Sequence, residues 1–323
     1  MRSSLVFVGL VCCFAAVAPA QRPDRGGNKL ELPQELKDAF ERSKSLRFSG
    51  TRTVTFVRAG KIESHSEYVT KDGPNMRIEF AKDSPFAGQI IVETEDSRKH
   101  YFPDKNEIRV NPSFGKKQFE ALRANFRSPR GGKLHIDSGI GGMVAGLHCT
   151  RYQVSDKDNN PIVQIYIEPR SGMLTKRVLY DQTGSIAGSF EFTSLVLNPK
   201  IQRNAFQIYR KGAKVIHPID ELRNQGTQLG MPALSLKVAS GYKLEGVYVR
   251  DIKGSKVLVQ NFANDESRLT LFMTKSQIDP ADLRRFDRGE LRSHVWTLNG
   301  VTLVLIGDLP EERLRNLSSQ VSE

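Results

Sequence analysis

Short runs of alternating apolar and polar residues, joined by turn residues at hairpin spacing, occupy most of the chain between Leu46 and Leu197. In the clearest run, Met76, Ile78 and Phe80 alternate with charged residues, which places the three apolar side chains on one face of a strand. Repeated runs of this kind predict an antiparallel meander. The predicted strands are Leu46–Val57, Lys61–Thr70, Met76–Phe80, Gln89–Glu93, Lys99–Phe102, Glu107–Val110, Leu147–Ser155, Ile162–Glu168, Leu174–Asp181 and Gly188–Leu197.

Two segments interrupt the strand pattern with helical spacing. The segment Leu32–Ser45 places Leu36, Ala39 and Phe40 on one face and has a proline near its first turn, so it predicts an amphipathic helix. Phe114–Phe126 has similar apolar spacing and predicts a second helix. Together with the meander, these helices predict an α+β fold in which a strongly curved antiparallel sheet is closed by helices.

The periodicity fails between residues 211 and 232, where glycines and prolines gather, and this segment predicts a linker between two domains. The larger domain is then 30–210, and residues 233–323 form a smaller α+β domain. The predicted strands of the smaller domain are Lys243–Asp251, Lys256–Phe262, Arg268–Thr274, His294–Leu298 and Val301–Gly307, followed by a terminal helix from Pro310.

The first twenty residues have the order of an export signal. Arg2 supplies a positive charge, Leu5–Val17 is apolar and uncharged, and Ala18-Pro19-Ala20 supplies small residues for a signal peptidase. The apolar run is short for a bilayer span, so cleavage after Ala20 and a periplasmic mature protein are predicted. A single retained anchor helix is the alternative.

The charge balance predicts anionic partners. The chain has 48 Lys and Arg against 36 Asp and Glu, a net charge of +12, and loss of Arg2 with the signal leaves 47 against 36, or +11. Export disfavours nucleic acid, so lipid head groups or an acidic protein surface are the expected partners. The acid-free run Arg123–Lys133 and the cluster of Arg284, Arg285 and Arg288 are the candidate docking surfaces, and the alternative is that both are only solvated.

A glycine-rich run at Gly139–Gly146 resembles a phosphate loop in composition but not in spacing. A dinucleotide fingerprint needs glycine where Val144 stands, and a P-loop needs lysine where Leu147 stands. The run is therefore interpreted as a flexible entry to the strand that begins at Leu147, with no bound cofactor.

The remaining chemistry-bearing residues do not form a recognisable catalytic set. Loss of the signal leaves Cys149 as the only cysteine, so no internal disulfide is expected, and adjacent strand positions direct Cys149 and His148 to opposite faces. Cys149 is interpreted as a buried structural thiol. Glu63 and His65 could share one face of a strand, but such pairs occur often by chance and do not indicate a metal site. The pair Glu93 and Glu95 is interpreted as part of a solvated face. No catalytic, cofactor-binding or metal-binding residue is predicted, and the chain is not expected to be an enzyme.

The stretch Gly146–Phe206 resembles the LolA/LolB lipoprotein-carrier fold. It contains the entry strand GLHCTRYQV, then IVQIYIEPRSGMLTKRVLYDQTGSI, and closes with FEFTSLVLNPKIQRNAFQI. The resemblance implies a half-barrel whose concave face offers a hydrophobic cleft for acyl chains.

Carrier proteins end there, whereas a linker followed by a second domain is similar to the MucB/RseB family of periplasmic sigma-E regulators. That second resemblance lies in SGYKLEGVYV, VLVQNFANDESRLTLFMTK and GVTLVLIGDLPEERLRNLSSQV. The family's aromatic-x-Asp-Gly turn is replaced here by Phe262-Ala263-Asn264-Asp265-Glu266, which lacks the glycine.

The MucB/RseB resemblance implies a non-enzymatic envelope-stress regulator, peripheral to the membrane. It would bind the periplasmic domain of an anti-sigma factor and be released by an acyl chain, a lipopolysaccharide or a lipoprotein ligand. The alternative is a carrier or chaperone for lipids or lipoproteins of the bacterial envelope, and an enzyme acting on lipid or glycan is a third hypothesis. The sequence does not specify the ligand or the oligomeric state.

Overall fold

The computed structural model describes residues 32–58, 61–113, 134–181, 183–252, 254–264, 267–276 and 291–323. Contacts divide these residues into a larger unit, within 26–108 and 113–213, and a smaller unit of 109–112 with 214–323. Within the described ranges, no helix is both long enough and apolar enough to cross a bilayer.

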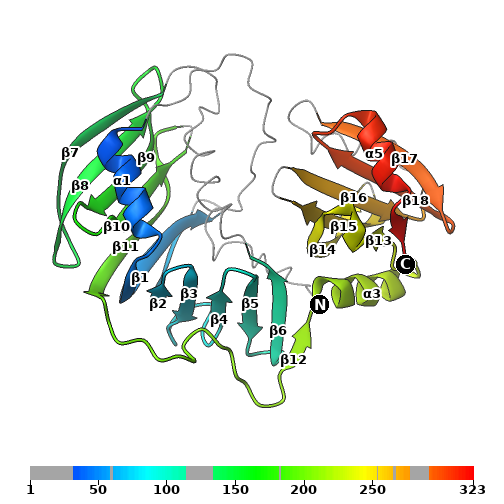
Figure 1. Cartoon of the computed structure of the whole chain (residues 1–323), viewed down its shortest axis with the longest axis horizontal. Helices are drawn as coiled ribbons and strands as arrows, with labels where there is room; N and C mark the ends of the chain where they lie inside the picture. The colour runs from blue at the N-terminus through cyan, green and yellow to red at the C-terminus, as the bar shows by residue number, and fades with distance from the viewer. Residues whose placement is uncertain are drawn as a thin grey trace. The chain divides into compact units, whose positions relative to one another are not determined.

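The larger sheet is built about β1 (Arg47–Arg58), which pairs along one side with β2 (Lys61–Asp72) and along the other with β11 (Ile186–Leu197). Its twelve strands are all joined antiparallel where the register is described, and Figure 1 shows them following an arc. The order is β12-β6-β5-β4-β3-β2-β1-β11-β10-β9-β8-β7. The remaining strands are β3 (Asn75–Phe80), β4 (Ile90–Glu93), β5 (Ser97–Phe102), β6 (Glu107–Pro112), β7 (His135–Val144), β8 (Leu147–Ser155), β9 (Pro161–Glu168), β10 (Met173–Tyr180) and β12 (Lys214–Ile216).

Helix α1 (Gln34–Ser43) lies on the inner side of this arc, which defines the concave face (Figure 1). Its predicted apolar stripe is confirmed, since Leu36, Ala39 and Phe40 are the buried residues of the helix. The C-terminal end is stabilised by Lys71, whose Nζ donates to the carbonyl oxygens of Ser43 at 3.3 Å and Lys44 at 3.4 Å. A cation at this position complements the partial negative charge of a helix C-terminus.

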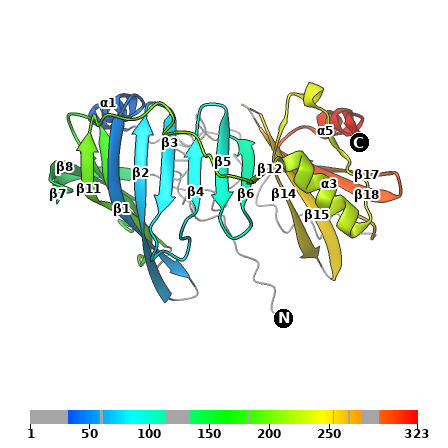
Figure 2. The same cartoon turned by 90° about the horizontal axis from the view of Figure 1, so that it is seen from below.

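The connection after β11 crosses the convex face of the sheet (Figures 1 and 2). Arg77 on β3 holds it by donating from Nη1 to the carbonyl oxygens of Ala205 at 3.1 Å and Gln207 at 3.0 Å. Farther along, the Arg210 guanidinium lies 5.4 Å from the centre of the Tyr101 ring. The convex face of the short strands is therefore partly covered by chain that has no regular structure.

The smaller unit has a five-stranded antiparallel sheet in the order β14-β15-β16-β18-β17. Helices α3 (Pro218–Leu229) and α5 (Glu311–Ser318) contribute Leu222, Leu314 and Leu317 to a core with one face of that sheet. The strands are β14 (Lys243–Ile252), β15 (Ser255–Ala263), β16 (Arg268–Thr274), β17 (Arg292–Leu298) and β18 (Val301–Gly307); β13 (Ser235–Leu236) pairs with β19 (Val321–Ser322), and η1 (Val238–Ser240) is a short 3-10 turn.

Two segments differ from the sequence prediction. The predicted linker 211–232 contains β12 and α3, because Pro218 occupies the first turn of the helix, where no backbone N–H is needed, and Gly230 ends the helix at φ 62°. The glycine-rich run is also not a flexible entry. Most of it belongs to β7, and Ala145 and Gly146, both at positive φ, make the two-residue turn into β8.

Candidate binding surface

The concave face is apolar where α1 covers it. Tyr152 on β8 and Ile165 on β9 pack with Leu36 of the helix in one buried cluster. The turn between β9 and β10 comes so close to α1 that a side chain at Gly172 would overlap the carbonyl of Ala39. Nearby, Arg42 Nη2 donates to the carbonyl of Pro169 at 2.9 Å, so α1 is held against this end of the sheet by packing and by a hydrogen bond.

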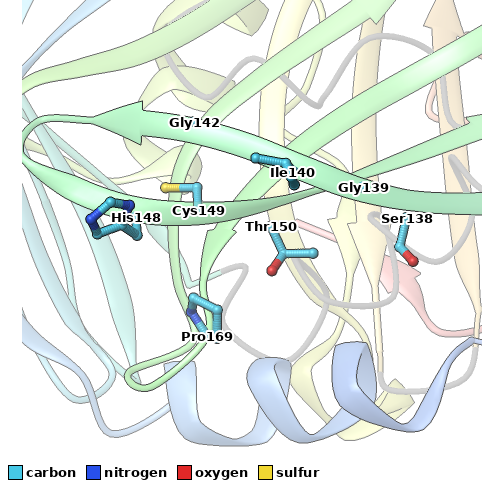
Figure 3. Close-up of a pocket in the computed structure, with 8 residues that line it drawn as sticks. All are labelled: Ser138, Gly139, Ile140, Gly142, His148, Cys149, Thr150 and Pro169. Atoms are coloured by element: carbon cyan, nitrogen blue, oxygen red, sulfur yellow. The ribbon is translucent and has the colours of Figure 1, made fainter.

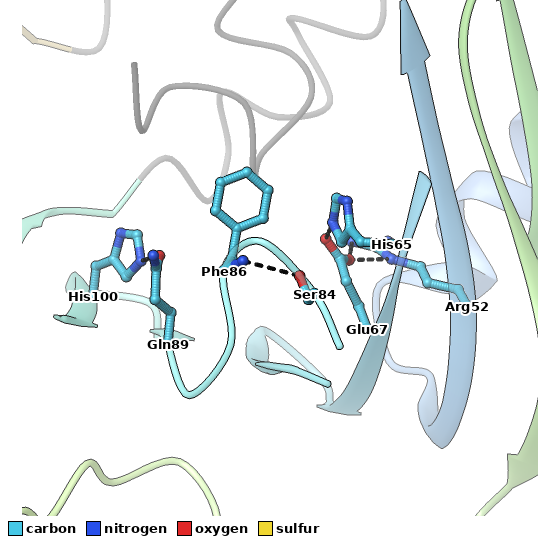
Figure 4. A network of polar contacts seen from close by, with 7 residues as sticks. All are labelled: Arg52, His65, Glu67, Ser84, Phe86, Gln89 and His100. Atoms are coloured by element: carbon cyan, nitrogen blue, oxygen red, sulfur yellow. Dashed lines mark hydrogen bonds and ion pairs between the residues drawn. The ribbon is translucent and has the colours of Figure 1, made fainter. Parts of the chain in front are cut away.

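Away from α1, the same face carries a buried ionic cluster of Arg52, His65 and Glu67 (Figure 4). The Glu67 side chain is 1% exposed and accepts from Arg52 at 2.6 Å and from His65 Nε2 at 2.9 Å. An ionised carboxylate only accepts, so Nε2 of His65 carries the proton. Among the described residues, Nδ1 of His65 has no hydrogen-bond partner.

The pKa of Glu67 reflects two opposed causes. Burial raises the pKa of this carboxyl, but the charge of Arg52 and the hydrogen bonds from His65 and Arg52 outweigh burial and hold the pKa below its ordinary value. Glu67 is thus ionised at neutral pH although it is buried. The cluster is a paired charge inside the protein, and it joins β1 to β2 on this face.

Aromatic rings surround the ionic cluster. The ring of Phe86, from the β3–β4 connection, lies 5.2 Å from His65 and 5.4 Å from Phe80, and Figure 4 shows it beside His65. On the other side, the Phe190 ring lies 5.1 Å from the Arg52 guanidinium and 5.3 Å from that of Arg177. Guanidinium groups near ring faces are attracted by the ring quadrupole, so the rings help to stabilise the buried cations.

The described part of the concave face also has a hollow of about 460 Å³ between the β7–β8 hairpin and the β9–β10 turn (Figure 3). The hollow is open to solvent and not enclosed. The lining combines small residues with a few apolar groups. It consists of Ser138, Gly139, Ile140, Gly142, His148, Cys149, Thr150 and Pro169.

Cys149 at this hollow is a hydrogen-bonded thiol. Its Sγ lies 3.1 Å from Oγ1 of Thr175 and donates to the carbonyl of Leu147 at 3.4 Å, and burial raises the pKa of the thiol. A thiol of raised pKa is a poor nucleophile. No hydrogen bond between Cys149 and the exposed His148 is described, so the two residues share the hollow but do not form a nucleophile–base pair.

The residues named from the sequence have different outcomes. Ile78 and Phe80 are buried on the concave face, and Arg77 binds the connection on the convex face, as the alternation predicts. The prediction of a solvated face is wrong for Glu93, which is buried with Oε1 accepting from Ser113. The run 123–133, the predicted second helix 114–126 and the arginine cluster at 284, 285 and 288 lie outside the described residues. In the described ranges, no three His, Cys, Asp or Glu side chains gather as a metal site.

The ionic cluster was not predicted, because Arg52 and Glu67 come from different strands. The sequence suggested His65 with Glu63, whereas His65 bonds Glu67 on the same strand, and Glu67 bonds Arg52 on the strand opposite. The available signal was the placement of charged residues at inward-facing positions of alternating strands, where an apolar residue is expected.

No protein-family model matches the chain, and no curated protein matches it. Among solved structures, an uncharacterised conserved protein from Thermus thermophilus is 16% identical over 57% of this chain and 98% of that chain, with a TM-score of 0.42.

A complex of MucA and MucB from Pseudomonas aeruginosa is 13% identical over 89% of this chain and 98% of that chain, with a TM-score of 0.40. A LolA superfamily protein from Nitrosomonas europaea is 10% identical over 54% of this chain and 97% of that chain, with a TM-score of 0.27. The structural neighbours therefore include both groups that the sequence resembles, at identities and TM-scores that do not establish membership of either family.

Proposed function

We propose that the protein is an exported, non-enzymatic binding protein of the bacterial envelope, with a polypeptide segment and an acyl chain as its two kinds of ligand. The observation that carries the proposal is that, in the described part of the chain, helical cover reaches only one end of the concave face. Among the described residues, α1 is the only helix packed on this face, and it packs over β8–β10. The hollow beside the β7–β8 hairpin lies next to that helix-covered end.

An acyl chain fits the chemistry of this end of the face. Each fully buried methylene contributes about 0.8 kcal/mol, so roughly ten buried methylenes correspond to micromolar affinity. The test is displacement of a fluorescent fatty acid from the purified protein. Thr150→Trp, which fills the hollow, should raise the dissociation constant at least about tenfold. Gln153→Trp, on the same strand but the opposite face, should leave it within about twofold.

The polypeptide ligand follows from the resemblance of the two-domain arrangement to the MucB/RseB regulators. The proposed ligand is the periplasmic segment of a membrane-anchored anti-sigma factor, with the basic runs of the chain favouring its approach. Calorimetric titration with that purified segment, from the same genome, tests the proposal. Saturable binding that acyl ligands weaken supports a regulator, and the absence of binding to both ligands would overturn the proposed function.

The second candidate is a lipid or lipoprotein carrier, which the curved sheet and its hollow also favour. A carrier moves its ligand between membranes, whereas a sensor only binds it. Transfer of a fluorescent lipid between two vesicle populations separates these functions: acceleration by catalytic amounts of the protein supports the carrier.

A further inference from the structure

We propose that the free edge of β7 is a docking site for an extended polypeptide strand that has apolar side chains on one face and, on the other, an acidic side chain beside Arg151. β7 is the last strand of the larger sheet, and both views place it at the outer end of the arc (Figures 1 and 2). In the described part of the chain, the backbone of 135–141 forms hydrogen bonds only with β8. The other side of the strand therefore presents a row of unpaired donors and acceptors, which an added strand satisfies.

Charged side chains that can protect an edge strand occur only at the start of β7, where His135 lies 3.7 Å from Asp137. Protected edges usually carry lysine, proline or inward-pointing charge. Here Ile140 is 96% exposed and Met143 is 61% exposed, and glycines at 139, 141 and 142 leave the backbone uncovered. A register shift between Ile140 and Gly142 bends the far part of the strand, so the straight part before it is the part open to pairing.

The concave side of the edge selects apolar residues. Ile140 is paired with Thr150, and both line the hollow, while Ile136 on the same face of β7 packs against the core under α1. Side chains of an added strand alternate between faces with a period of two residues. Every second side chain of the ligand thus lies beside Ile140, and one of them is placed to enter the hollow.

The convex side favours an acidic residue beside Gly139 and a basic residue beside Asp137, which is exposed on the same face of β7. Arg151 is paired with Gly139, and its Nη2 lies 3.4 Å from the position that a side chain on Gly139 would occupy. Among the described residues, Arg151 forms no ion pair, and its buried Nε has no hydrogen-bond partner. The neighbouring Lys176 is already paired with Glu191 at 2.7 Å. A carboxylate on the convex side of the ligand would supply the missing partner of Arg151.

This docking edge rests on the proposed function, because both have a polypeptide as the ligand. It adds the place on the larger sheet where that polypeptide binds. The probe is a fluorescein-labelled eight-residue peptide in which four valines alternate with serine, lysine, aspartate and serine. Its control has the same composition, with the four valines followed by the four polar residues. Fluorescence anisotropy with the full-length protein should give a dissociation constant at least about tenfold lower for the alternating peptide. Hydrogen exchange of the amides of β7 should slow when it is bound.

Two variants and a matched control test the named side chains. Ile140→Asp should weaken the alternating peptide at least about tenfold, and Arg151→Gln should weaken it and reduce its salt dependence. Ile62→Asp, an exposed apolar position on β2, should leave binding within about twofold. Equal affinity for the two peptides, or unchanged binding by both variants, overturns the docking edge. If those results occur while the anti-sigma segment still binds the wild type, the proposed function stands without this edge.

Discussion

Replacing Glu67 with glutamine removes the charge that pairs Arg52 and His65 inside the larger unit. Loss of one partner from a buried ion pair costs about 3–5 kcal/mol. The cost is lower here, because the Arg52 side chain is 17% exposed and reaches water, and because glutamine keeps one acceptor oxygen. We therefore expect a loss of about 2–3 kcal/mol, which lowers the melting temperature by about 5–10 °C for a unit of this size.

Scanning calorimetry is the suitable assay, because the only tryptophan of the chain, Trp296, lies in the smaller unit and does not report on the cluster. Glu191→Gln is the matched control, since Glu191 is half exposed and paired with Lys176 at 2.7 Å. An exposed pair contributes less than about 1 kcal/mol, so this control should unfold close to the wild type.

The pH dependence of unfolding tests whether the charge of Glu67 stabilises the larger unit. The folded pKa of Glu67 lies below the ordinary glutamate value of 4.5, so its stabilising contribution is complete above that pH and is lost as pH falls through the folded pKa. The difference between wild type and Glu67→Gln should thus be constant near neutral pH and shrink below about pH 4.5. An equal melting temperature at pH 7, or a difference that grows in acid, would contradict a stabilising ion pair.

Three further predictions concern other parts of the chain. Native Cys149 should react with a thiol reagent at pH 8 only over hours, because burial raises its pKa, and complete labelling within a minute would contradict this. Gly172→Ala should lower the free energy of unfolding of the larger unit by more than about 2 kcal/mol in urea, because its side chain would overlap α1. The control is Gly184→Ala, also at positive φ but in open space, which should cost only about 1 kcal/mol. Equal losses would show that the contact between Gly172 and α1 does not affect stability. Trypsin should cut first after Arg210, which is exposed just before the smaller unit begins, and mass spectrometry should find two resistant fragments; a first cut within α3 would contradict the boundary.

Alternation predicted the strands well because it is a local signal. β8, β16 and β18 begin and end where the sequence places them. β7 was missed because its glycines suggested a flexible segment, although a strand at a sheet edge tolerates them. The helix α3 was missed because Pro218 and Gly226 were taken as breakers, whereas one lies in the first turn and the other packs closely against the carbonyl of Met231.

The ionic cluster on the concave face was less predictable than the strands, because it depends on which strands are neighbours and on their register. Arg52 meets Glu67 only in the observed register of β1 against β2. Arg52 and Arg177 both lie near the Phe190 ring, which requires β10 and β11 to be paired with the rest of the sheet. Register depends on how all the strands bury one face together, and a single sequence does not specify it. Sequence patterns therefore indicate which face of each strand is buried, but not which charged residues meet there.

The central position of β1 has a consequence for the order in which the chain folds. β1 can form its hairpin with β2 at once, but its other edge waits for β11, which comes near the end of the larger unit. Pairings between such distant segments are slow, because the loop that joins them must close before the contacts stabilise it. A chain with this topology can complete the larger sheet only after most of the chain has been made.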